Sequence, residues 1–294
     1  MDRRILITGA ASGLGKALAK AALDDGARVL LTDQDPEAGE LTRLEFAERI
    51  REAGGDVHRV AFLPLDVRDD VAWDGAREWC AREWSGLDVL VNNAGVAAAG
   101  PIADIPMADW DWILDINLKG VIRGVRTFVP MFTDQGGGHV VNIASLAGLM
   151  NLANMASYNV TKAGVISLSE TMRSELEPLG IRTTVVCPSF FRTNLADRMR
   201  TTDPAFEVMA RKAIAGEIFP GPKLTADDVA RKVLRAVDRR RFLLLPHVET
   251  RLLWAVKRLA PSPFAKAMAA GNRLVEKRFG TAAAGHQKAT GRVH

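Results

Sequence analysis

Tyr158 and Lys162 are the residues of this sequence whose types and spacing point most directly to chemistry. Tyr158 is the only tyrosine, Lys162 follows four positions later, and Ser145 lies thirteen residues upstream. On a helix, this spacing places the phenol and the ammonium on one face, where the positive charge favours the phenolate. A phenol that ordinarily titrates near ~10 could then exchange protons near neutral pH. The alternative is an ordinary pair of packed surface side chains.

The elements that would position such a site begin at the N-terminus. The apolar run 4–8 predicts a buried parallel strand, 9–15 is a glycine-rich turn, and 16–25 has a helical pattern. Gly9, Gly13 and Gly15 let the backbone approach a pyrophosphate, and the start of a helix offers N–H groups to an anion. Their spacing differs from the common G-x-G-x-x-G fingerprint.

Asp33 ends a second apolar run, 28–32, eighteen residues after Gly15. An acidic side chain at the tip of a second strand can accept both hydroxyls of an adenosine ribose and repels a 2′-phosphate. The alternatives are a solvated loop acid or a helix cap ahead of Pro36.

Taken together, these motifs resemble the short-chain dehydrogenase/reductase family from about Arg3 to Pro246. Residues 8–15 resemble its TGxxxGxG cofactor turn, 66–67 its adenine-contacting pair, 92–95 its NNAG segment and 188–193 its PGxxxT segment beside the nicotinamide. One departure is Ser189, where the family usually has glycine. By this resemblance the cofactor contacts are Gly9, Ser12, Gly13, Leu14, Gly15, Asp33, Asp66, Val67, Asn93, Ala94, Gly95, Tyr158, Lys162, Pro188 and Thr193.

The active-site motifs of the family match the chain as well. Ser145, Tyr158 and Lys162 fall on its serine and YxxxK positions, and Asn117 on its helix asparagine. The resemblance implies hydride transfer between a nicotinamide and a carbinol or carbonyl carbon, with Tyr158 as acid/base and Ser145 bonded to the substrate oxygen. Lys162 would lower the pKa of Tyr158 and hold the ribose, and Asn117 would anchor a water that relays protons. Homo-oligomers are typical of the family.

The cofactor expected is NAD(H) rather than NADP(H). Asp33 is followed by Gln34 and Asp35 rather than by an arginine, and Ser12 is uncharged, so no side chain here pairs with a 2′-phosphate.

The order of elements predicts an α/β fold: a Rossmann-like, doubly wound parallel sheet of about seven strands with helices on both faces. The cofactor then lies across the carboxyl edge of the strands, where the motifs emerge. We expect one catalytic domain over 1–246, a basic amphipathic helical extension over 247–280 and a disordered tail over 281–294. The strands are expected at 4–8, 28–32, 57–63, 89–92, 139–144, 182–187 and 241–245.

The substrate is expected to be a hydrophobic small molecule, because the segments 96–101, 146–155 and 189–219 are rich in large apolar residues. The same residues would also suit a mobile lid or a subunit interface. A secondary alcohol or ketone fits the implied chemistry. The alternative function is a catalytically weak NAD(H)-binding sensor or membrane-surface scaffold on the same fold.

The segment 239–280 carries ten lysines or arginines and two acidic residues, whereas the whole chain has a net charge of only +4. Leu252, Leu253, Val256 and Leu259 would form one helical stripe beside basic residues. This helix would lie on a membrane surface, or dock on the body or on a neighbouring subunit; it is too short and charged to span a bilayer. Nucleic-acid binding is not expected, since no recognition motif accompanies the charge.

Composition sets the remaining expectations. The two cysteines argue against a disulfide framework and favour a reducing, cytoplasmic compartment. The first strand starts so near Met1 that no cleavable signal is expected. The five histidines show no metal-ligand spacing, so no metal site is expected.

Overall fold

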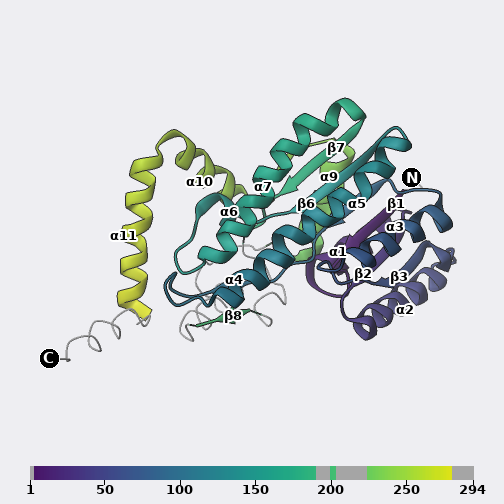
Figure 1. Cartoon of the computed structure of the whole chain (residues 1–294), viewed down its shortest axis with the longest axis horizontal. Coiled ribbons are helices and arrows are strands. Elements are labelled where there is room, and N and C mark those ends of the chain that lie inside the picture. The colour runs from purple at the N-terminus through teal and green to yellow at the C-terminus, as the bar shows by residue number, and fades with distance from the viewer. Residues whose placement is uncertain (1–2, 190–198, 203–223, 280–294) are drawn as a thin grey trace.

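The computed structural model describes residues 3–189, 199–202 and 224–279, the last six of them as backbone only. Seven parallel strands form one sheet in the order β3-β2-β1-β4-β6-β7-β9, with helices on both faces (Figure 1). The predicted Rossmann-like, doubly wound fold is therefore confirmed. The strands are β1 Arg4–Thr8, β2 Arg28–Asp33, β3 Val60–Pro64, β4 Val89–Asn92, β6 Gly138–Ile143, β7 Ile181–Val186 and β9 Leu243–Leu244.

Helices connect these strands and cover the sheet. One irregular turn, η2 at Asp115–Lys119, is a π-helix between α4 and α5, and η1 Val57–Arg59 and η3 Glu177–Leu179 are 3₁₀ turns. The α-helices are α1 Gly13–Asp24, α2 Pro36–Glu52, α3 Asp70–Trp84, α4 Met107–Leu114, α5 Gly120–Asp134, α6 Ala147–Met150, α7 Ala156–Leu176, α9 Ala226–Asp238, α10 Val248–Leu259 and α11 Pro261–Phe279.

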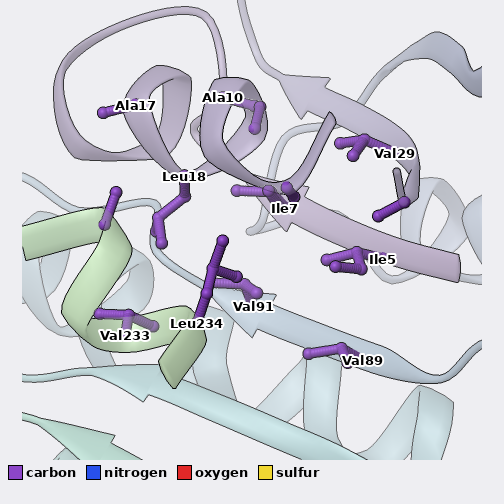
Figure 2. Packing of buried hydrophobic residues seen from close by; sticks show 14 of the residues in the cluster. Ile5, Ile7, Ala10, Ala17, Leu18, Val29, Val89, Val91, Val233 and Leu234 are labelled. Atoms are coloured by element: carbon purple, nitrogen blue, oxygen red, sulfur yellow. The ribbon is translucent and has the colours of Figure 1, made fainter. Parts of the chain in front are cut away.

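Successive side chains of each strand point to opposite faces of the sheet, so the core is divided between the two faces. Ile5 and Ile7 belong to one cluster with residues of α1, α2 and α9, and Figure 2 shows Ile7 beside Leu18 of α1 and Ile5 further along the same strand. Leu6, between them in sequence, packs on the opposite face with residues of α3, α5 and α7. Burial on both faces explains why the strands read as continuous apolar runs.

Two of the sequence-based strand predictions need correction by more than one residue, and one strand pairing was not predicted. The strand expected from Val57 begins at Val60, because Asp56 accepts a hydrogen bond from the His58 N–H and starts a 3₁₀ turn instead. The strand expected over 241–245 is reduced to β9. A second, two-stranded parallel sheet joins β5 Ala98–Ala99 to β8 Arg200–Thr201. Such short pairing between distant segments leaves no periodic signal in sequence.

The C-terminal helices α10 and α11 stand at one side of the body (Figure 1). Trp254 packs against the cluster around β7, and the Lys257 ammonium bonds the Leu149 carbonyl. One face of α10 is thus docked on the body. The predicted apolar stripe instead stays exposed, with exposed fractions of 69% for Leu252 and 87% for Leu259. Contact of this stripe with a membrane or a neighbouring subunit stays a prediction, as does the division at residues 246 and 280; the tail 281–294 lies outside the described residues.

No helix within 3–189, 199–202 and 224–279 is both long and apolar enough to cross a bilayer.

Candidate active site

The turn between β1 and α1 is built from backbone conformations that glycine adopts most readily. Gly9 and Gly13 have φ of +63° and +54°. A Cβ on Gly15 would lie 2.1 Å from the Gly9 carbonyl oxygen, so this position also requires glycine. Ser12 is the N-cap of α1 but its side chain makes no capping bond, and the first-turn N–H groups can therefore serve an anion. The turn fits a dinucleotide pyrophosphate; Leu14 is buried and can contribute only backbone.

Thr8 and Asn93 fasten this turn to the segment after β4. The Thr8 hydroxyl accepts hydrogen bonds from the N–H groups of Asn93 (3.0 Å) and Ala94 (2.9 Å). The Asn93 side-chain amide in turn donates to the carbonyls of Thr8 (2.8 Å) and Gly9 (3.2 Å). The structure therefore brings two predicted cofactor segments together. The role of the Thr8 hydroxyl was not foreseen from sequence, although Thr8 stands within the matched motif.

Asp33 lies at the carboxyl end of β2, where the ribose acceptor was expected. Its carboxylate accepts hydrogen bonds from the N–H of Ala11 in the glycine turn (3.1 Å) and from that of Asp35 (3.2 Å), and its exposed fraction is 7%. It is neither a solvated loop acid nor a helix cap, because Asp35 caps α2 by accepting from the Ala38 N–H. These contacts hold the carboxylate beside the glycine turn.

Asp66 and Val67, the predicted adenine-contacting pair, follow β3. The Arg68 guanidinium donates to both Asp66 carboxylate oxygens at 2.6–3.0 Å, and this bonding lowers the pKa of Asp66. The Val67 carbonyl accepts from the indole of Trp73 at 3.1 Å. The Arg68 partner was missed in the sequence, although its position two residues after Asp66 permits the contact.

The predicted catalytic residues converge at the carboxyl edge of the sheet. Tyr158 and Lys162 occupy successive turns of α7, and Ser145 follows β6. The Lys162 ammonium lies 5.8 Å from the centre of the Tyr158 ring and donates to the carbonyl of Ile143 at 3.0 Å. Both side chains are buried, with exposed fractions of 7% and 4%, so they are not a surface pair.

The electrostatics of this pair correct one sequence-based expectation. Burial raises the pKa of Tyr158, and the opposing effect is a hydrogen bond with the Ser145 side chain rather than the charge of Lys162. Burial also lowers the pKa of Lys162 to about 8. The prediction that Lys162 lowers the pKa of Tyr158 is therefore wrong for the protein without cofactor. Both groups lose hydration in the same apolar surroundings.

Asn117 lies in the π-helix η2, and its side chain holds the backbone of Val96, which follows Gly95 in the chain. Its side-chain oxygen accepts from the Val96 N–H and its amide donates to the Val96 carbonyl, both at 2.8 Å. The same amide reaches the Thr161 hydroxyl at 3.3 Å. A Cβ on Gly95 would lie 3.2 Å from the Asn117 oxygen and 3.4 Å from the Lys162 nitrogen. The absence of a side chain at Gly95 thus gives these polar groups room.

Tyr158 belongs to a buried apolar cluster. Ala97, Ala98, Ala99, Ile113, Ala147 and Met155 are buried in it, with Trp112, Leu152 and Met199 packed against it. Part of the predicted pocket, 190–198 and 203–219, lies outside the described residues, as does the predicted cofactor contact Thr193. Pro188 is described, and its carbonyl accepts from the Leu146 N–H at 2.8 Å, next to Ser145.

No group of three or more potential metal ligands occurs in the described part of the chain. Cys187 is buried, and burial raises the pKa of its thiol to about 12, so it is protonated at neutral pH.

The family model described as short chain dehydrogenase matches residues 3–204. The chain belongs to the short-chain dehydrogenase family. Its members are oxidoreductases that bind NAD(P), act on CH–OH groups of small molecules and generally form oligomers.

Similar proteins share most of this chain. It is 30% identical over 264 residues to the probable oxidoreductase EphD of Mycobacterium tuberculosis, a match covering 88% of this chain and 43% of EphD; the chain thus spans less than half of that relative. It is 33% identical over 192 residues to a 3-alpha-(or 20-beta)-hydroxysteroid dehydrogenase of the same species, covering 65% of this chain and 70% of that enzyme. The crystal structure of a short-chain dehydrogenase/reductase from Burkholderia phymatum in complex with NAD is 30% identical, with a TM-score of 0.76 over 88% of this chain and 95% of that one.

Proposed function

We propose that this chain transfers a hydride between NAD(H) and a secondary alcohol or ketone of a hydrophobic small molecule. The observation that carries the proposal is the convergence of buried Tyr158, Lys162 and Ser145 at the sheet edge, beside the dinucleotide turn. A protein that only bound the cofactor would have no need to bury a phenol and an ammonium within 5.8 Å of each other. Burial of both groups costs desolvation free energy, and a catalytic role accounts for their placement.

The nicotinamide supplies the hydride chemistry, and the side chains handle one proton. In the reducing direction the Tyr158 hydroxyl donates its proton to the substrate oxygen, and in the oxidising direction it accepts that proton. Ser145, which bonds Tyr158, also bonds the substrate oxygen and stabilises the charge that grows there. Lys162 holds the nicotinamide ribose, next to Tyr158 on the same helix. Asn117 would anchor the water that relays protons toward Lys162, while its side-chain oxygen and nitrogen hold Val96.

Asp33 supports NAD(H) over NADP(H). Its carboxylate is fixed against the N–H of Ala11, beside the turn that would hold the pyrophosphate. At this position a carboxylate accepts the ribose hydroxyls and repels a 2′-phosphate. The neighbouring Gln34 and Asp35 supply no positive charge to offset that repulsion.

The apolar cluster around Tyr158 supports a hydrophobic substrate. The cluster contains three consecutive alanines, Ala97 to Ala99, together with Met155 and Ile113, and offers only apolar side chains beside the Tyr158 ring. The hydroxysteroid dehydrogenase resembled by this chain is named for a ligand of that kind. We therefore expect a cyclic or long-chain secondary alcohol rather than a polyol.

The test is a paired calorimetric titration with NADH and NADPH, followed by NAD⁺-dependent oxidation of a panel of hydrophobic secondary alcohols. Matched primary alcohols and sugar alcohols serve as controls. We expect tighter NADH binding and turnover confined to the hydrophobic secondary alcohols. Tighter NADPH binding would contradict the role of Asp33. Binding of neither cofactor would contradict the enzyme reading and would leave the scaffold alternative.

A further inference from the structure

The chain just after β7 continues as an extended run between two neighbours. On one side, the N–H groups of Ala144 and Leu146 donate to the carbonyls of Val186 and Pro188, both at 2.8 Å. These bonds flank Ser145. The backbone at Pro188 is therefore tied directly to the residue that precedes α6 and follows the proposed catalytic serine.

On the other side, the ladder of backbone hydrogen bonds from β7 to β9 ends in a side-chain acceptor instead of a carbonyl. The N–H groups of Val185 and Cys187 donate to the carbonyls of Phe242 and Leu244, at 2.7 and 2.9 Å. This register assigns the next N–H, that of Ser189, to the carbonyl of Pro246. The Pro246 carbonyl instead accepts from the Lys232 ammonium of α9 at 2.8 Å.

The imidazole of His247 takes the place of that carbonyl. Its Nδ1 accepts from the Ser189 N–H at 3.2 Å, and the exposed fraction of the side chain is 5%. An imidazole nitrogen accepts only when it carries no proton, so the bond requires neutral His247. Burial lowers the pKa of His247; the ammonium of Lys232 acts in the same direction and the carboxylate of Glu249 against it. The surroundings therefore favour the neutral acceptor.

We propose that His247 is a positioning residue, which completes the β7 ladder with its side chain and so fixes the Pro188–Ser189 backbone against Ser145. The proposal rests on the proposed function in one respect: this backbone matches the segment that lies beside the nicotinamide, so its position sets the alignment of substrate and Ser145. Serine at 189 is compatible with this role, since the bond uses its backbone N–H.

Three variants separate this role from simple packing. His247→Asn keeps an acceptor the same number of bonds from the backbone as Nδ1, His247→Gln moves the acceptor one carbon further, and His247→Leu fills the space without an acceptor. Each is compared with the wild type by hydrogen exchange of the Ser189 amide, thermal midpoint, NADH affinity, and kcat and KM for a ketone.

In His247→Leu, we expect the Ser189 amide to exchange about tenfold faster and kcat to fall about tenfold, the equivalent of one lost hydrogen bond. His247→Asn should restore both to within about threefold, with NADH affinity unchanged in all variants. Equal loss in the Asn and Leu variants, or retained amide protection in the Leu variant, would overturn the proposal. Should His247→Leu fail to fold, His247→Gln provides the misplaced acceptor. A wild type without turnover would sink the proposed function, while Ser189 protection would still decide the role of His247.

Discussion

Replacement of Thr8 by valine tests how the dinucleotide turn is held. Valine keeps the shape of the side chain but removes the hydroxyl that accepts from the N–H groups of Asn93 and Ala94. Thr8 is 1% exposed, so water replaces the lost acceptor poorly. Leaving a donor without a partner costs about 1 kcal/mol at the low end, and two donors therefore cost about 2 kcal/mol.

The assay combines urea unfolding with NADH titration, and Thr8→Ser is the matched control. Serine keeps the hydroxyl and loses only a methyl group, at a cost of about 1 kcal/mol in unfolding free energy. We expect Thr8→Val to weaken NADH binding about tenfold, because Asn93 and the Gly9 turn shift together, while Thr8→Ser stays within about twofold. A valine variant with wild-type stability and wild-type NADH affinity would refute this reasoning.

Two further substitutions probe charge in the fold. Asp33→Asn keeps an oxygen for the Ala11 N–H but removes the charge, so NADH binding should weaken by about tenfold or more while NADPH binding improves, as measured by paired titrations. His139 is 7% exposed and burial lowers its pKa to about 4. The unfolded chain takes up a proton near ~6.5, before the native state does, so the native state loses about 3 kcal/mol as the pH falls from ~6.5 to ~4. His139→Gln should remove this part of the acid destabilisation, and an unchanged pH profile of urea unfolding would contradict it.

Much of the fold follows from sequence because it depends on local rules. Apolar runs buried on both faces predicted the seven-stranded sheet, and β1 and β4 begin and end where expected. The glycine turn was readable because Gly9 and Gly13 adopt positive φ and Gly15 has no room for a Cβ. The placement of Asp33 followed from its position at the end of a strand.

The remaining features depend on contacts between distant segments. The hydroxyl of Thr8 and the imidazole of His247 act by bonding backbone that lies 85 and 58 residues away, and neither residue has a local signature for this. The direction of the Tyr158 pKa depends on burial by several elements, which i,i+4 spacing does not report. Of the alternatives for the stripe of α10, docking of its leucines on the body is the one that the structure does not show, because Trp254 packs there instead.

The most direct test of the account is the turnover of Tyr158→Phe set beside its NADH affinity. The chain has no other tyrosine to replace the lost hydroxyl. We predict that kcat for a responsive secondary alcohol falls by roughly 10²–10⁴, the contribution of general acid–base catalysis, while the Kd for NADH changes by less than about threefold. Near-full turnover in Tyr158→Phe would contradict the assignment of Tyr158 as the acid and base of this site.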